Sequence, residues 1–156
     1  MSHVHLYQAT LNWTGAANGP TESYAAYSRD YEVTVPGKAV IQGSADPTFR
    51  GDPARHNPED LQVMALSACH LLTYLALCAR GGIKVLSYED HADGQMELQD
   101  GKIRFTRVTL RPRVVIGRGS DPHRAQELHE KAHEECFIAS SVNFPVGHEA
   151  EIVVAD

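Results

Sequence analysis

Apolar side chains fill most positions of one central stretch, residues 56–82. Asn57 is a suitable helix cap and Pro58 suits the first helical position, while Gly81 and Gly82 suit a left-handed turn at the end. A helix that is apolar nearly all round is either a membrane span or the buried axis of a domain. Polar side chains interrupt this one, so the pattern favours the buried axis: they are Gln62, Ser67, His70, Thr73 and Tyr74.

Strand-like alternation dominates on both sides of this helix. Residues 5–13 and 31–42 predict antiparallel strands, the second of them turning at Pro36-Gly37. A polar loop, 43–56, leads into the helix. Further elements follow it: strands at about 85–98 and 102–116 joined by Asp100-Gly101, a helix from Asp121-Pro122 to about Phe137, and a strand at 149–155. Strands segregated from two helices predict an α+β fold.

Composition restricts the function classes. The 156 residues suit one domain, 1–156, with a substantial core. The net charge is −6 and no basic block occurs, so nucleic-acid binding is not expected. The first residues lack the basic and apolar regions of a signal peptide, and three cysteines are too few for a disulfide scaffold. We therefore expect a cytoplasmic protein with reduced thiols and no membrane segment.

The second helix carries a possible metal motif. His129, Glu130 and His133 match the H-E-x-x-H pattern of zinc hydrolases, and Cys136 follows three residues later. The segment is rich in His and Glu throughout, so a chance match on a solvated helix face is the favoured interpretation, with a zinc site as the alternative.

The three cysteines differ in their setting. Cys69 lies near the middle of the first helix and Cys136 ends the second, so the two thiols form a redox pair if the helices pack together. Cys78 is nine residues after Cys69, about 180° around a helix, and is assigned to packing. Glu59 and Cys69 lie ten residues apart, roughly 15 Å along a helix axis. In an antiparallel pair of such helices about a two-fold axis near Met64, each Glu59 comes level with the other chain's Cys69.

Several segments carry a family likeness. The run Asn57-Pro58-Glu59-Asp60-Leu61, followed by Ala65-Leu66-Ser67-Ala68-Cys69, resembles the N-P-E-x-L…A-A-C helix of the OsmC/Ohr family, the osmotically inducible and organic-hydroperoxide-resistance proteins. The segment SYEDHADGQMEL, Cys136 and the closing strand also fit. The resemblance covers almost the whole chain.

This resemblance implies an OsmC-like α+β fold with antiparallel sheets, a long central helix and an intertwined homodimer whose active sites lie at the interface. It implies a thiol peroxidase that reduces organic hydroperoxides, with Cys69 as the peroxidatic and Cys136 as the resolving cysteine. No cofactor is expected to be bound, and an external dithiol such as dihydrolipoamide is the implied reductant. The chemistry suits these residues, because a sulfenic acid formed on one thiol condenses with the other.

The resemblance also implies an arginine that activates the thiol and a carboxylate that orients it. Glu59 matches the carboxylate. Arg50, in the loop before the helix, is our choice of arginine, while Arg29 and Arg55 remain alternatives.

Two positions depart from the family pattern. Phe137 follows Cys136 where the family typically has proline, and His70 follows Cys69 where it often has phenylalanine. His70 is interpreted as a core histidine with a satisfied hydrogen bond, and a base beside Cys69 is the alternative. The alternative function is therefore an OsmC-fold protein that binds a small apolar or electrophilic molecule without turning over peroxides.

Overall fold

The computed structural model describes residues 3–156, which form two compact units divided after Leu61. The first unit is built on a three-stranded antiparallel sheet: β1 (Thr10–Asn12), β2 (Tyr31–Thr34) and β3 (Ile41–Gly43). The turn between β2 and β3 contains Pro36-Gly37, as predicted. Gly37 has φ 76°, and Lys38 N donates to Val35 O at 3.1 Å.

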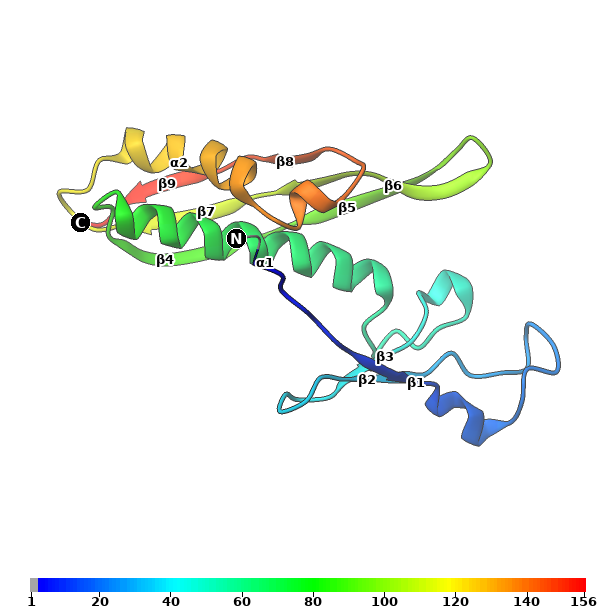
Figure 1. The fold of residues 1–156 in the computed structure, drawn as a ribbon. Helices are drawn as coiled ribbons and strands as arrows, with labels where there is room; N and C mark the ends of the chain where they lie inside the picture. Colours follow the sequence, from blue (N-terminus) through cyan, green and yellow to red (C-terminus); the bar gives the residue numbers. More distant parts are fainter. Residues whose placement is uncertain (1–2) are drawn as a thin grey trace. The chain divides into compact units, whose positions relative to one another are not determined.

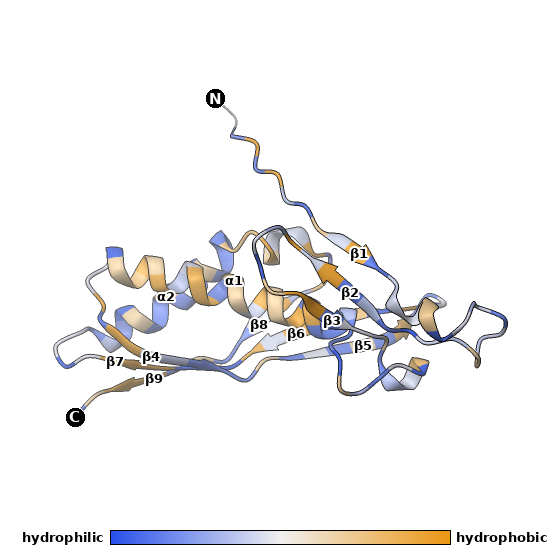
Figure 2. Cartoon of the chain, turned by 90° about the horizontal axis from the view of Figure 1, so that it is seen from below, coloured by the Kyte–Doolittle hydropathy of each residue, from blue (hydrophilic) through white to orange (hydrophobic). Residues whose placement is uncertain are grey.

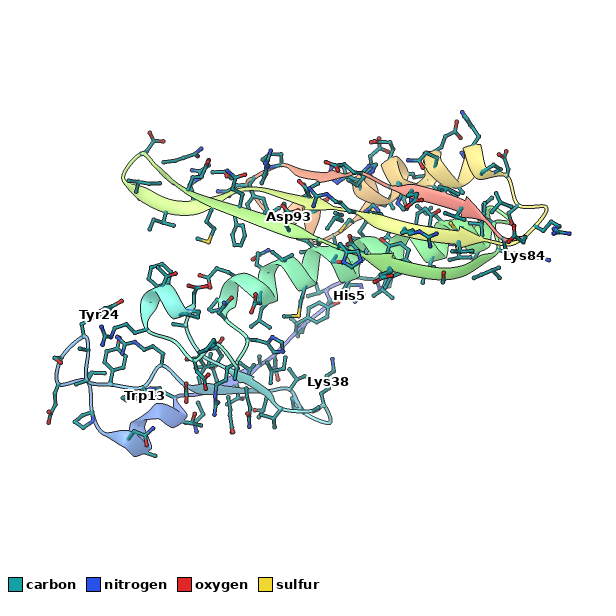
Figure 3. The ribbon with its side chains drawn as sticks, turned by 180° about the vertical axis from the view of Figure 1, so that it is seen from behind. His5, Trp13, Tyr24, Lys38, Lys84 and Asp93 are labelled. Atoms are coloured by element: carbon teal, nitrogen blue, oxygen red, sulfur yellow. The ribbon has the colours of Figure 1, made fainter. Side chains whose placement is uncertain are left out.

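Two short 3-10 helices complete this unit, η1 (Thr14–Asn18) and η2 (Pro47–Phe49). Trp13, just before η1, donates through its ring nitrogen to Ser28 O at 2.7 Å. Trp13 and Tyr24 are labelled in Figure 3, where they lie on the loops that flank the sheet. The loop between η1 and β2 also carries Arg29, which lines the cavity described below.

The long helix α1 (Pro58–Arg80) begins at the end of this unit and continues into the second. Its start is capped as predicted: Asn57 Oδ1 accepts from Asp60 N at 2.7 Å, and Asp60 Oδ2 accepts from Asn57 N at 3.3 Å. This reciprocal pair satisfies amide groups that a helix start otherwise leaves free.

The second unit places α1 and α2 (Pro122–Glu135) on one side of the β4–β7–β9 sheet (Figures 1 and 2). This sheet contains β4 (Val85–Asp90), β7 (Pro112–Ile116) and β9 (Glu151–Val154). The other sheet contains β5 (Asp93–Gln99), β6 (Lys102–Leu110) and β8 (Val146–His148). Lys84, labelled in Figure 3, marks the turn between α1 and β4. A last 3-10 turn, η3 (Ala139–Ser141), follows α2.

The two predicted long strands are each divided in the structure. β4 pairs with β7 and β5 pairs with β6, so the hairpin passes from one sheet into the other. Asp90 holds this corner, since its carboxylate accepts from Arg111 N at 2.6 Å and from Ser67 Oγ at 2.5 Å. β8 was not predicted. It pairs parallel with β6, and β9 pairs parallel with β7, so neither sheet is wholly antiparallel.

Within the single chain, α1 is buried on one face only. The buried residues of this face are Leu66, His70, Tyr74, Leu77 and Cys78. Tyr74, Leu77 and Cys78 pack with α2 and the β4–β7–β9 sheet, and Leu66 packs with β6 and β8. Cys78 packs in the core, as predicted. The helix is long and apolar enough to cross a membrane by length and composition, but core helices of soluble proteins share these properties. The α+β class with a long central helix is confirmed.

Candidate functional site

The second unit brings two of the three cysteines together. Cys69 lies in the middle of α1 and is partly exposed, whereas Cys136 caps the C-terminal end of α2 and is buried. Burial raises the pKa of Cys136 to about 11, and a hydrogen bond with the Cys69 thiol adds to the increase. Cys136 therefore stays a protonated thiol at neutral pH, next to a second thiol that solvent reaches more easily.

The backbone around both cysteines is held by local hydroxyl groups. Thr73 Oγ1 donates to Cys69 O at 2.9 Å, and Ser140 Oγ donates to Cys136 O at 3.0 Å. Ala139 N donates to Cys136 Sγ at 3.4 Å, which fixes the direction of that thiol. These hydrogen bonds hold the backbone of both cysteines and the thiol of Cys136 in place.

A groove of about 560 Å³ runs beside this pair of cysteines. Thr73 and Ser140 line it, so it adjoins the backbone of each cysteine. Phe137, next to Cys136, is 83% exposed and forms part of its apolar wall. The other lining residues are Leu72, Ala76, Leu77, Arg80, Glu134 and Glu135.

On the inner side of α1, aromatic rings form a buried stack. His70 Nε2 lies 3.0 Å from His129 Nδ1, and the ring of Tyr74 stacks on His129 with centroids 3.8 Å apart. Burial, with the nearby histidines His148 and His133, lowers the pKa of His70 to about 4. Burial also lowers the pKa of His129, to about 3. Both rings are therefore neutral at physiological pH, and the interpretation of His70 as a hydrogen-bonded core histidine is confirmed.

This stack corrects the assignment of the H-E-x-x-H segment to a solvated helix face. His129 is 0% exposed because α2 turns it toward α1, while Glu130 lies on the outer side and pairs with His148 at 3.1 Å. Across residues 3–156, no three His, Cys, Asp or Glu side chains are arranged to hold a metal ion.

In the first unit, Glu59 lines a cavity of about 340 Å³. Its Oε2 atom is buried and has no hydrogen-bond partner within residues 3–156. Arg29 lines the same cavity. The Arg29 guanidinium stacks on the ring of Tyr27 at 3.8 Å and donates to the Tyr24 and Tyr27 carbonyls. A fixed cation and an unpaired carboxylate therefore share one cavity.

The other two candidate arginines lie elsewhere. Arg50 ends η2 in a left-handed conformation, φ 67°, is exposed, and does not line the Glu59 cavity. Arg55 forms ion pairs with Asp30 at 3.6 Å and Asp52 at 3.7 Å. The geometry therefore associates Arg29, not our first choice Arg50, with Glu59.

Comparison with known proteins identifies the family. Residues 51–151 match the family model described as OsmC-like protein. The chain belongs to the OsmC-like protein family. An OsmC-like protein of unknown function from Vibrio cholerae, VCA0330, has a similar structure with 34% identity and a TM-score of 0.86, covering 94% of this chain and 99% of that one.

Two further relatives of this OsmC-like protein are more distant. The organic hydroperoxide resistance protein OhrB of Bacillus subtilis is similar in fold, with 21% identity, a TM-score of 0.64 and coverage of 96% of this chain and 100% of that one. The uncharacterized protein YmaD of Bacillus subtilis is 22% identical over 141 residues, 88% of this chain and 87% of its own length. The matched family region includes Cys69, Cys136 and Glu59.

Tyr31 is a polar residue of the Glu59 cavity that the sequence analysis missed. The sequence contains one indication of its role. Tyr31 begins β2 only two residues after Arg29, so a site that includes Arg29 is expected to include the first residue of this strand as well. Its cross-strand neighbour is Gly43, which only the register reveals.

Proposed function

We propose that this OsmC-like protein is a cysteine-based peroxidase that reduces organic hydroperoxides to alcohols. The observation that supports this most directly is the pairing of a partly exposed thiol, Cys69, with a buried and protonated thiol, Cys136. A peroxidatic cysteine needs access to its substrate, and a resolving cysteine needs only to reach the first sulfur. The organic hydroperoxide resistance proteins among its structural relatives point the same way.

The reaction has three steps. The Cys69 thiolate attacks the distal oxygen of the hydroperoxide, the O–O bond breaks, and the alcohol leaves after taking a proton. The Cys69 sulfenic acid then condenses with the Cys136 thiol, which forms a disulfide and releases water. An external dithiol of the dihydrolipoamide type reduces the disulfide by exchange and is itself oxidised.

For the charged groups of the site we propose Glu59 and Arg29. A carboxylate that accepts from a guanidinium fixes the direction of its planar donors, and a fixed cation stabilises both a thiolate and a developing alkoxide. The shared cavity and the unpaired Glu59 oxygen support Arg29 over Arg50.

We further propose that the protein works as a homodimer with its active sites at the interface. Only 28% of the most apolar window of α1 is buried within the chain. Met64, Ala68 and Leu72 recur at four-residue intervals on its exposed side, and Leu72 is 67% exposed. A stripe of this kind on a long helix suits a symmetric pairing with a second copy. Mixed dimers of Glu59→Ala and Cys69→Ser chains test it, since sharing across the interface restores one site and separate sites restore none.

The experiment that tests the peroxidase proposal is peptide mass spectrometry without reductant after brief exposure to cumene hydroperoxide, repeated after dihydrolipoamide. We expect a Cys69–Cys136 disulfide within seconds and its loss on adding the dithiol. Cys69→Ser must lose the reaction, while Cys78 remains a free thiol throughout. Unreacted thiols would instead favour a small-molecule binding protein, for which the groove beside the cysteines offers about 560 Å³.

A further inference from the structure

The cavity that holds Arg29 and Glu59 contains a third polar group, the phenol of Tyr31. Tyr31 is the first residue of β2 and lies opposite Gly43 on β3. A Cβ atom on Gly43 would lie 2.2 Å from the Tyr31 ring and 2.5 Å from its hydroxyl oxygen. The glycine therefore leaves space for the ring to lie across the neighbouring strand, which fixes where the hydroxyl group sits.

The Tyr31 hydroxyl group is available to a ligand. Within residues 3–156 it forms no hydrogen bond to another residue. Burial raises the pKa of Tyr31, and the charges of Glu59 and Asp60 raise it further. The phenol is therefore fully protonated at neutral pH and able to donate.

The other polar groups of the cavity do not share this property. A guanidinium group donates hydrogen bonds without giving up a proton, and an ionised carboxylate only accepts them, so neither Arg29 nor Glu59 suits proton donation. The Ser44 hydroxyl is fully buried and accepts from Asp52 N at 3.1 Å. Asp46 accepts from Thr48 N at 2.7 Å. Tyr31 is thus the group of this cavity best suited to give up a proton.

We infer that Tyr31 is a catalytic acid for hydroperoxide reduction at Cys69 of the other chain. This inference rests on the proposed function and its homodimer, in which the Glu59 cavity of one chain comes level with Cys69 of the other. When the Cys69 thiolate bonds to the distal oxygen, the electron pair of the broken O–O bond stays on the proximal oxygen as an alkoxide. Tyr31 transfers its proton to that oxygen, the alcohol leaves, and the tyrosinate regains a proton from water. The transfer is favourable because an alkoxide is a stronger base than a phenolate.

The three polar residues of the cavity therefore have different roles in the reaction. Arg29 stabilises negative charge without proton transfer, Glu59 orients Arg29, and Tyr31 neutralises the leaving oxygen. A leaving group that is already a weak base, such as a carboxylate, needs no proton. The contribution of Tyr31 must therefore depend on which hydroperoxide is reduced.

The experiment compares Tyr31→Phe with wild type in stopped-flow measurements of Cys69 oxidation, using tert-butyl hydroperoxide, cumene hydroperoxide and peracetic acid. Phenylalanine keeps the ring over Gly43 and removes only the hydroxyl group. We expect Tyr31→Phe to lose about 100-fold in rate with both alkyl hydroperoxides, in the range typical of general acids, and little with the peracid. Tyr7→Phe, on an exposed side chain, is the matched control and should match wild type with all three.

The possible results distinguish a failure of the Tyr31 role from a failure of the peroxidase proposal. A wild type that reacts while Tyr31→Phe loses nothing, or loses equally with all three oxidants, overturns the role of Tyr31 alone. A wild type whose Cys69 reacts with none of them overturns the peroxidase proposal and this inference with it.

Discussion

Acidification should destabilise the second unit through its buried histidine pair. An unfolded histidine has a pKa of about 6.5. In the folded chain burial lowers the pKa of His70 to about 4 and that of His129 to about 3. Between these limits the unfolded state binds more protons than the folded state. The stability that the neutral pair provides is complete above pH 6.5 and is lost as the pH falls toward the folded values.

The size of the loss follows from proton linkage. Between pH 7.5 and pH 5.0 each unfolded imidazole gains about 2 kcal/mol from protonation, while the folded rings remain almost entirely neutral. The unfolding free energy should therefore fall by about 4 kcal/mol between pH 7.5 and pH 5.0 because of these two histidines. This is a large part of the roughly 5–15 kcal/mol typical of a domain. Most carboxylates stay ionised down to pH 5.0, so the effect is separable from ordinary acid unfolding.

Urea unfolding followed by circular dichroism at half-unit pH steps measures this loss. His123→Gln is the control, because the His123 side chain is 83% exposed and should leave the pH dependence unchanged. In the double variant His70→Gln with His129→Gln, most of the dependence should disappear whatever the absolute stability. A wild-type change below about 1 kcal/mol between pH 7.5 and pH 5.0 would refute the argument.

Three further predictions concern the site and the helix start. Arg29→Ala should reduce kcat/KM for cumene hydroperoxide by about 100-fold or more while Arg50→Ala changes it little; the opposite ranking would restore Arg50 as the catalytic arginine. Cys136→Ser should complete one turnover and stop with Cys69 as a sulfenic acid that dimedone traps, and continued turnover with dithiol would exclude a resolving role. Asn57→Ala should lower the unfolding free energy by about 1 kcal/mol in urea titrations, because it removes the α1 cap; unchanged stability would mean that the cap is redundant.

The sequence predicted those parts of the fold whose signals are local. The start of α1 is encoded by Asn57 and Pro58, and the turn between β2 and β3 by Pro36-Gly37, so both appear where expected. The three-residue strand β8 has too short a pattern to be recognised. Its position depends on pairing with β6, which is distant in sequence.

The site was less predictable because its contacts are long-range. The burial of His129 depends on a partner 59 positions away, His70, and the composition of α2 suggested an exposed face instead. The choice among three arginines depends on how the loops of the first unit fold. Proximity in sequence favoured Arg50, whereas Arg29, in the loop before β2, lines the cavity of Glu59.

The parallel pairing of the last two strands has a consequence for folding kinetics. β8 joins β6 and β9 joins β7, so each sheet of the second unit gains its third strand from residues 146–154. The β5–β6 hairpin forms from near neighbours, but these pairings close long loops that include α2, and such closures are slow. Until they form, β6 and β7 each present an open sheet edge, the kind of surface that promotes association between partly folded chains. The docking of this final segment therefore governs both the folding rate of the second unit and its tendency to aggregate on the way.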